Sequence, residues 1–249
     1  MKIELVSYRY NIKSGMKRDL TLKIINNSSS NLILFSGHTI TNGKDIKYVG
    51  DRIENTKSSI FLELEDIGAR DINNWSFKIE KGKLVNCSTH QLFSTSNEIN
   101  KNQYCAENLY NEIRLKRIHK IGRKKICLLV CGELNILTNL QAQGNAVKIR
   151  VDADEIKVKF KELFDSVDIF LNPIHSPMGN QGKMHKRREY FSDNGRAYFS
   201  TSNLQYYAIE ANYHFPKTKA LQYAYYDGSP ISAIKEYYDK NHLKRIFEI

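Results

Sequence analysis

The sequence predicts a single α/β domain covering residues 1–249, with a mixed sheet or a pair of sheets. Short apolar or alternating runs, bounded by Gly, Asn and Ser, recur along the chain and are followed by segments with helical spacing. The stretch "EKGKL" (80–84) has the composition of a hairpin turn, so part of the sheet is expected to be antiparallel. No linker rich in Pro, Gly or Ser divides the chain.

The predicted strands share short length, apolar or alternating side chains and polar or glycine boundaries. They are Lys2–Tyr8, Asn31–Ser36, Ser59–Glu65, Trp75–Glu80, Lys83–Cys87, Lys125–Cys131, Val167–Pro173, Ala197–Ser202 and Leu221–Tyr226. The predicted helices carry apolar residues three or four positions apart. They are Lys13–Asn26, Ala106–His119, Asp154–Phe164 and Ile231–Ile246. Polar loops after strands, at Ser94–Asn102 and Ser176–Gly182, are where α/β proteins build their sites.

The composition indicates a globular protein of the cytoplasm. Hydrophobic residues make up 41% of the chain and charged residues 26%. No apolar run is long enough to span a bilayer, and "MKIELVSYRY" lacks the features of a signal peptide, so no membrane partner is expected. The 4 cysteines are expected to be reduced. Cys87 and His90 have no second ligand pair at matching spacing, so neither a metal nor a cofactor is expected.

The net charge of +11 raises the question of an anionic partner. The basic residues gather in "KRIHKIGRKK" (116–125) and "KMHKRR" (183–188). A solvated helix terminus explains the first cluster, because cations favour the negative end of the helix dipole. A phosphate-binding surface is the alternative, but no nucleic-acid-binding motif accompanies the charge. A nucleic-acid partner therefore stays open without a motif to support it.

The segment "KKICLLVCGELNIL" (124–137) holds the candidate nucleophile. An apolar strand ends at Cys131, and Gly132 permits a tight turn into the next helix. Backbone N–H groups at such a turn stabilise a thiolate and later an oxyanion. Cys127 points to the same side but lies deeper, as a core residue would. Since free cysteine is among the most buried residue types, a structural role for Cys131 remains the alternative.

Several stretches, in order along residues 1–205, resemble the nitrilase, or carbon–nitrogen hydrolase, superfamily. They are "NLILFSGHTIT", "NNWSFKIEKGKLVNCSTHQLF", "ICLLVCGELNIL", "SVDIFLNPIHSPMG" and "NGRAYFSTSN". The resemblance implies an α-β-β-α sandwich that often forms homodimers. It also implies a cysteine nucleophile, here Cys131, with a glutamate as base and a lysine that stabilises the oxyanion, acting on a small amide or nitrile substrate.

The sequence departs from this pattern at both helper residues. Where the family has Phe-Pro-Glu, this chain has Phe35-Ser36-Gly37 followed by His38, and where the family has lysine, it has Thr89 or His90. Two hypotheses follow. Either His38 or His90 replaces the base, which gives a Cys/His pair, or the site is catalytically silent and serves for ligand binding or assembly.

The remaining predicted site residues surround the thiol. Gly132 and Glu133 follow it directly, and Glu133 is expected to anchor the site loops by hydrogen bonds as well as to line the substrate site. Asn172 ends a later strand, and His175 lies just beyond it at the rim, where it would contact substrate. The predicted function is a thiol-dependent carbon–nitrogen hydrolase with a non-standard triad.

Overall fold

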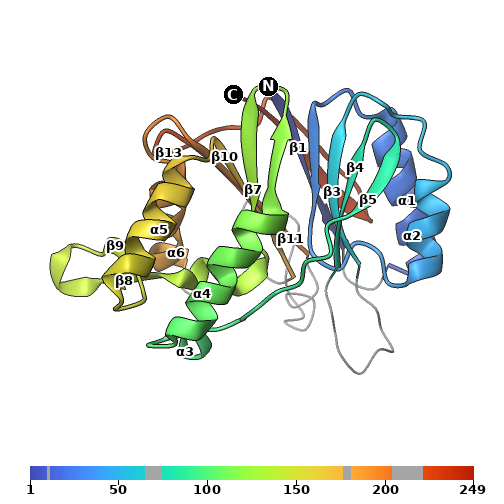
Figure 1. Ribbon diagram of the computed structural model, residues 1–249. Helices are drawn as coiled ribbons and strands as arrows, with labels where there is room; N and C mark the ends of the chain where they lie inside the picture. Colours follow the sequence, from blue (N-terminus) through green and yellow to red (C-terminus); the bar gives the residue numbers. More distant parts are fainter. Residues whose placement is uncertain (10–11, 65–74, 176–180, 204–220) are drawn as a thin grey trace.

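The computed structural model describes residues 1–9, 12–64, 75–175, 181–203 and 221–249, and shows two β-sheets face to face with helices on both outer sides (Figure 1). A 7-stranded sheet has the order β14-β15-β1-β2-β3-β4-β5, and a 6-stranded sheet has the order β13-β12-β11-β10-β7-β6. Strands β8 and β9 form a separate two-stranded ribbon. The result is the α-β-β-α sandwich that the resemblance implied.

The 7-stranded sheet is mixed, since β1, β2 and β3 are parallel while β15, β4 and β5 pair antiparallel with their neighbours. Its strands are β1 (Lys2–Tyr8), β2 (Leu32–Phe35), β3 (Ser59–Leu64), β4 (Trp75–Glu80), β5 (Lys83–Asn86), β14 (Lys235–Tyr238) and β15 (His242–Glu248).

The 6-stranded sheet has a parallel centre, in which β10 lies between β7 and β11. Its strands are β6 (Ile118–Ile121), β7 (Lys124–Leu128), β10 (Ile169–Ile174), β11 (Ala197–Ser202), β12 (Gln222–Tyr226) and β13 (Ser229–Pro230). The ribbon consists of β8 (Leu137–Leu140) and β9 (Ala146–Ile149).

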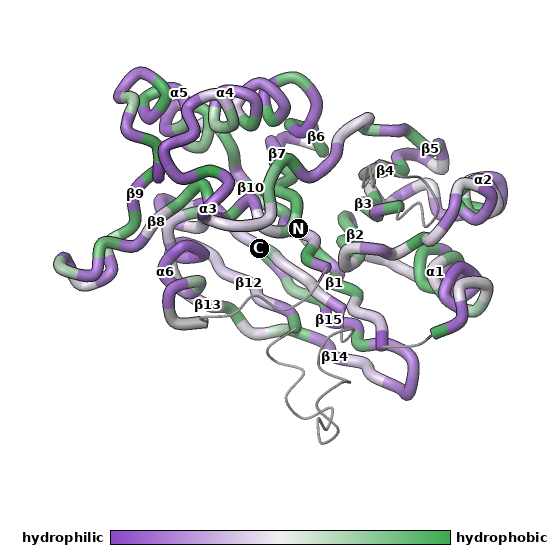
Figure 2. The backbone as a smooth tube through the Cα atoms, turned by 90° about the horizontal axis from the view of Figure 1, so that it is seen from below, coloured by the Kyte–Doolittle hydropathy of each residue, from purple (hydrophilic) through white to green (hydrophobic). Residues whose placement is uncertain are grey.

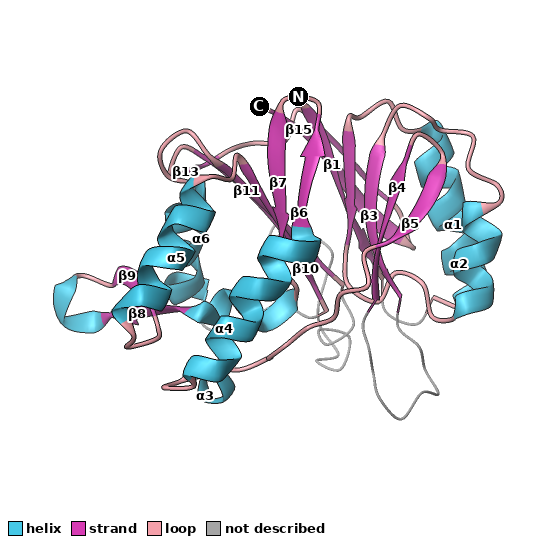
Figure 3. Cartoon of the chain, in the orientation of Figure 1, coloured by secondary structure: helices cyan, strands magenta, loops and turns pink. Residues whose placement is uncertain are grey.

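The helices cover the outer faces, as the secondary-structure colouring of Figure 3 makes plain. Helices α1 (Ser14–Asn27) and α2 (Gly43–Gly50) lie on the 7-stranded sheet; α4 (Gln103–Glu112), α5 (Asp154–Asp165) and α6 (Gln181–Ser192) lie on the other. The shorter elements are α3 (Ser96–Ile99), a π-helical turn η1 (Ile113–Arg117) and the 3-10 helices η2 (Cys131–Ile136) and η3 (Gln141–Gln143).

Three apolar layers hold these elements together. The layer between the sheets joins residues such as Leu34 and Phe61 to Leu128 and Leu171, all essentially inaccessible to solvent. The outer layers contain Ile25 on the inner face of α1, and a group of phenylalanines contributed by α5, α6 and β10. Figure 2 shows hydrophobic colour along β7 and mixed colour along the outer helices. Each such buried side chain contributes roughly 1.5–3 kcal/mol.

The predicted C-terminal helix Ile231–Ile246 is wrong, because this segment forms β14 and β15. Leu243, Arg245 and Phe247 are buried at alternate positions, and β15 pairs antiparallel with β1 along its whole length. Pairing of β15 with both β14 and β1 therefore overrides the helical spacing. The predicted helix Ala106–His119 also ends early, since α4 gives way to η1 and then to β6.

Helix α6 was not predicted, and it contains the basic cluster 183–188. Its buried side chains include Arg187 and Arg188 as well as Met184 and Phe191, so apolar periodicity does not mark it. Most of the predicted loop Ser176–Gly182 lies outside the described residues. Across the described ranges, no helix is both long enough and apolar enough to cross a bilayer.

Candidate active site

The predicted strand Lys125–Cys131 ends early, because β7 stops at Leu128 and two buried residues lead to η2. Cys131 begins η2, and its backbone is in the left-handed region with φ of 34°. Such a conformation is costly for a residue with a Cβ and typically persists at functional turns. Gly132 is required here, because a Cβ at this position would lie 2.1 Å from the carbonyl oxygen of Ser94. Cys131 is partly exposed, whereas Cys127 is fully buried, so the turn presents the first thiol and hides the second.

Asn172 holds this turn from the neighbouring strand β10. Its amide Nδ2 donates to the carbonyl oxygens of Leu129 at 2.7 Å and Cys131 at 3.3 Å. The Tyr198 hydroxyl donates to its Oδ1 at 2.8 Å. Both ends of the buried amide are thus engaged with the protein. Asn172 therefore positions the backbone that carries the thiol, and its contact with substrate stays a prediction.

Glu133 and Arg117 form an ion pair in which neither side chain is exposed. The Glu133 carboxylate also accepts hydrogen bonds from the backbone N–H groups of Leu92 and Val130, each at 2.9 Å. Arg117 in turn donates to the Thr89 hydroxyl at 2.6 Å. This network is the loop anchor expected of Glu133. Direct contact between Glu133 and substrate, the other expected role, does not fit a carboxylate that is completely buried and paired.

His175 follows β10 and connects the thiol to a carboxylate. Its Nε2 lies 2.7 Å from Oε2 of Glu63, a fully buried glutamate on β3. Burial opposes a positive charge on His175, but the Glu63 carboxylate and a hydrogen bond with the Cys131 side chain together raise its pKa to about 11. Burial likewise disfavours the charge on Glu63, and the two histidines beside it hold its pKa below the usual range. Cys131, His175 and Glu63 therefore form a thiol–imidazole–carboxylate chain.

His38 completes the cluster from the end of β2. Its ring centroid lies 3.9 Å from that of His175, and its backbone N–H donates to Glu63 Oε2 at 3.0 Å. Burial and the charge on His175 lower the pKa of His38 to about 4. His38 is consequently neutral near pH 7 and lies against the His175 ring, while His175 is the histidine that contacts the thiol.

The carboxylate of the site comes from Glu63 on β3, whereas the family pattern places its glutamate just after β2. Gly37 stands where the family has its glutamate, and a Cβ added there would lie 2.2 Å from Cδ2 of His175 and 2.8 Å from Oε2 of Glu63. Glu63 and His175 thus fill the space that a side chain at position 37 would enter. The Gly37 N–H also donates to the carbonyl oxygen of Ile174 at 3.1 Å, which links the two sheets beside the site.

His90 lies elsewhere. Its carbonyl oxygen accepts from Arg117 at 2.7 Å, and among the described residues no interaction joins its side chain to Cys131. Sequence reasoning named Cys131, His38 and His175 but missed Glu63 and Arg117. The available signal for Glu63 was an acidic residue in the middle of the apolar run "SIFLEL", since such a residue on a buried strand must have a partner.

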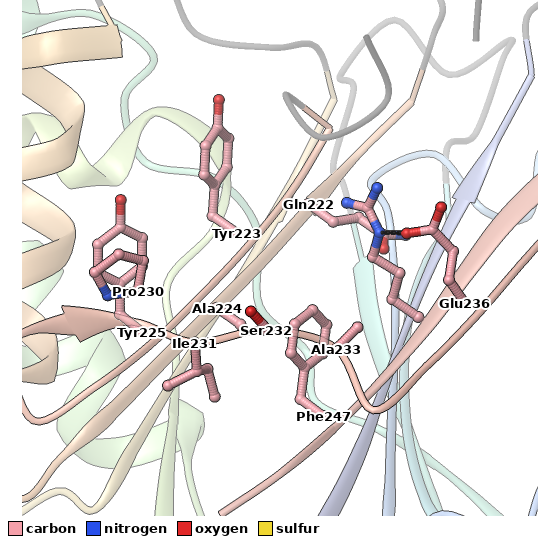
Figure 4. Close-up of a pocket in the computed structure, with 11 residues that line it drawn as sticks. Gln222, Tyr223, Ala224, Tyr225, Pro230, Ile231, Ser232, Ala233, Glu236 and Phe247 are labelled. Carbon is pink, nitrogen blue, oxygen red and sulfur yellow. Dashed lines mark hydrogen bonds and ion pairs between the residues drawn. The ribbon is translucent and has the colours of Figure 1, made fainter. Parts of the chain in front are cut away.

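A separate hollow lies between β12, β13, β14 and β15, with a volume of about 440 Å³ (Figure 4). Arg245 pairs with Glu236 on one side of it, and Phe247 and Ile231 supply apolar lining. None of the cluster residues Cys131, His175, Glu63 and His38 lines this hollow, so it is distinct from the candidate active site.

The fold is that of the nitrilase, or carbon–nitrogen hydrolase, superfamily, as comparison with solved structures shows. One similar structure is a carbon–nitrogen hydrolase superfamily protein from Xanthomonas campestris, with an arsenic adduct in its active site; TM-score 0.55, 11% identity, covering 100% of this chain and 90% of that one. Another is an amidase from Nesterenkonia sp. AN1 with acrylamide added at its active-site cysteine; TM-score 0.57, 10% identity, covering 100% and 93%.

A third similar structure is a glutamine-dependent NAD(+) synthetase from Cytophaga hutchinsonii, with a TM-score of 0.53 and 12% identity. The match covers 93% of this chain, which spans only 40% of the synthetase. No protein-family model matches the sequence, and no curated protein matches it. At identities this low, the resemblance is confirmed for the fold, and the activity must be argued from the site.

Proposed function

We propose that this protein is a thiol hydrolase that cleaves the C–N bond of a small amide, with Cys131 as nucleophile, His175 as general base and acid, and Glu63 as the group that orients His175. The observation that carries the proposal is the contact chain from the partly exposed thiol through His175 to the buried Glu63. The amidase and the carbon–nitrogen hydrolase superfamily protein of similar fold support the same reaction class.

The reaction proceeds in two halves. Since its raised pKa keeps His175 protonated near neutral pH, the proton rests on the imidazole and the Cys131 sulfur attacks the amide carbon as the anionic partner of this pair. The resulting tetrahedral oxyanion collapses with cleavage of the C–N bond. The proton passes from His175 to the departing amine, which leaves a thioester on Cys131. His175 then takes a proton from water as the water attacks the thioester. Cleavage of the C–S bond releases the carboxylic acid and restores the thiol.

The lysine that the family uses for the oxyanion has no counterpart at Thr89 or His90, because Thr89 is buried against Arg117. We assign this contact to the backbone N–H of Gly132 at the start of η2, in the manner of an oxyanion hole. Glu63 fixes the orientation of the His175 ring through its contact with Nε2.

Alkylation of the free thiols tests the proposal within one molecule. Cys105 on α4 is also partly exposed, and burial raises its pKa, so it is an internal reference for Cys131. Iodoacetamide at pH 7, with site-resolved mass spectrometry, is expected to label Cys131 at least tenfold faster than Cys105. A His175→Gln variant should lose this difference while the rate at Cys105 stays unchanged. Equal rates at both thiols in the wild-type protein would reject the activated nucleophile.

Turnover is tested with a panel of small amides, by release of ammonia or amine. The wild-type protein should hydrolyse at least one member, and Cys131→Ser should abolish that activity. A catalytically silent binding module is the second candidate, favoured by the missing lysine. It predicts binding of panel members without release of product and an unchanged affinity in Cys131→Ser.

A further inference from the structure

His38, Glu63 and His175 bring three metal-ligating atoms within 4.8 Å of one another. They come from the end of β2, the middle of β3 and the end of β10, so the fold, rather than a sequence motif, assembles them. We propose that this cluster binds a divalent transition-metal ion such as Zn²⁺, and that the bound ion blocks the thiol site. Two imidazoles and one carboxylate form a ligand set that proteins use for zinc.

The carboxylate provides an independent observation. Glu63 is fully buried, and its Oε1 has no hydrogen-bond partner among the described residues, although Oε2 accepts from both His38 and His175. A buried carboxylate oxygen without a partner is costly, and a cation placed beside it removes that cost. The unsatisfied atom therefore indicates that Glu63 serves a second ligand in addition to the two histidines.

The geometry requires only local adjustment. Ligand atoms about 2.1 Å from a tetrahedral zinc ion lie about 3.4 Å apart. The Nε2–Oε2 contact between His175 and Glu63, at 2.7 Å, must open slightly, and the wider separations in the cluster must close. Rotation of the side chains provides both movements. The Cys131 side chain already contacts His175, so an ion bound to this imidazole would lie near the thiol.

The ligand set also selects the ion. Imidazole nitrogens suit Zn²⁺, Co²⁺ and Ni²⁺, whereas Mg²⁺ and Ca²⁺ require oxygen ligands. The ion replaces the proton that His175 shares with Glu63, so metal binding and base catalysis exclude each other. Metal binding does not depend on turnover, because the cluster offers the same ligands in a silent protein.

Titration of metal-free protein with Co²⁺ and Zn²⁺ tests the site by calorimetry and by the visible spectrum of bound Co²⁺. One equivalent of each ion is expected to bind, while Mg²⁺ should not. His38→Ala, which keeps the proposed catalytic residues, should weaken binding at least tenfold, as should Glu63→Gln. His185→Ala is the matched control, since His185 pairs with Glu189 at 3.0 Å but belongs to no metal-ligating group within the described part of the chain.

Absence of binding to the wild-type protein, or equal binding to His38→Ala and wild type, would overturn the metal site. If His38→Ala does not fold, the metal site is tested in the wild-type protein by whether Zn²⁺ protects Cys131 from alkylation. Zn²⁺ should slow iodoacetamide labelling of Cys131 at least tenfold and leave Cys105 unaffected, and equal slowing of both thiols would reject the site. Slow labelling of Cys131 without metal contradicts the hydrolase proposal, whereas fast labelling that Zn²⁺ does not change contradicts only the metal proposal.

Discussion

Oε2 of Glu63 lies 2.7 Å from Nε2 of His175, and both side chains occupy the space beside Gly37. In the family pattern, that position carries the glutamate base. The loss of one acidic side chain is therefore matched by another from the adjacent strand, with an imidazole between the carboxylate and the thiol. The glutamate that the family pattern places at position 37 thus has as its counterpart here a carboxylate–imidazole–thiol contact chain.

Replacing Glu63 with Gln should slow alkylation of Cys131 at least tenfold and reduce amide hydrolysis by 10²–10⁴, the range typical of general acid–base groups. Without the carboxylate charge, His175 is no longer held in the orientation that serves the thiol. Site-resolved labelling and product release measure the two effects. Glu4→Gln, which changes another buried glutamate of the same sheet, is the control and should leave labelling unchanged.

Gly37→Ala should impair the same site by steric contact. The new Cβ would lie 2.2 Å from Cδ2 of His175, so the ring must move away from Glu63 or the thiol. We expect labelling of Cys131 to fall at least tenfold while the fold persists by circular dichroism. Gly15→Ala in α1 is the matched control, because its Cβ would meet no atom within 4 Å. That variant should label normally and gain up to about 1 kcal/mol of stability from helix propensity.

Arg117→Met should lower the free energy of unfolding by about 3–5 kcal/mol, because it leaves the buried Glu133 carboxylate without its cation. Urea denaturation measures the change. Lys161→Met breaks the solvent-exposed pair with Asp165 and should cost less than about 0.5 kcal/mol. Equal losses in the two variants would show that the Arg117–Glu133 pair does not hold the loops beside Cys131.

His119 should make stability depend on pH. Burial and the charge of Lys78 lower its pKa from 6.5 to about 4, and its Nε2 lies 4.0 Å from the Cys87 sulfur. The unfolded chain then binds more protons between these values, so this stability is present above pH 6.5 and is lost as pH falls toward 4. Between pH 7 and pH 5 the loss is at most about 2 kcal/mol, reduced by partial exposure of the ring. Urea denaturation at both pH values should show a smaller drop for His119→Asn than for wild type.

Local patterns predicted the strands well, because alternation and turn residues are encoded within each segment. Lys2–Tyr8, Trp75–Glu80 and Ala197–Ser202 form strands with the predicted bounds. The prediction of a helix over Ile231–Ile246 was wrong because the segment pairs with β1, a partner more than 200 residues away in the chain, and local spacing does not reveal this pairing. Helix α6 was not predicted, because arginines take buried positions that apolar residues usually occupy.

The site residues also separate into those that the sequence reveals and those that only the fold brings together. The turn at Cys131 and Gly132 is visible in the sequence because strand, thiol and glycine are consecutive. Glu63 is not, because only the parallel pairing of β2 with β3 places it beside the end of β2. His175 was predicted to contact substrate at the rim, and its place between thiol and carboxylate depends on how two separate sheets face each other.

That division has a mechanical consequence. The Glu63 carboxylate belongs to the 7-stranded sheet, whereas the Cys131 thiol and the His175 imidazole follow strands of the 6-stranded sheet. The hydrogen bond from the Gly37 N–H to the Ile174 carbonyl joins the two sheets near the site. A slide of one layer over the other by a single ångström would separate the proton donor from its acceptor without unfolding any strand. The apolar packing between the sheets therefore sets the alignment of the proposed catalytic groups, and a change of side-chain volume in that layer should change the reactivity of Cys131.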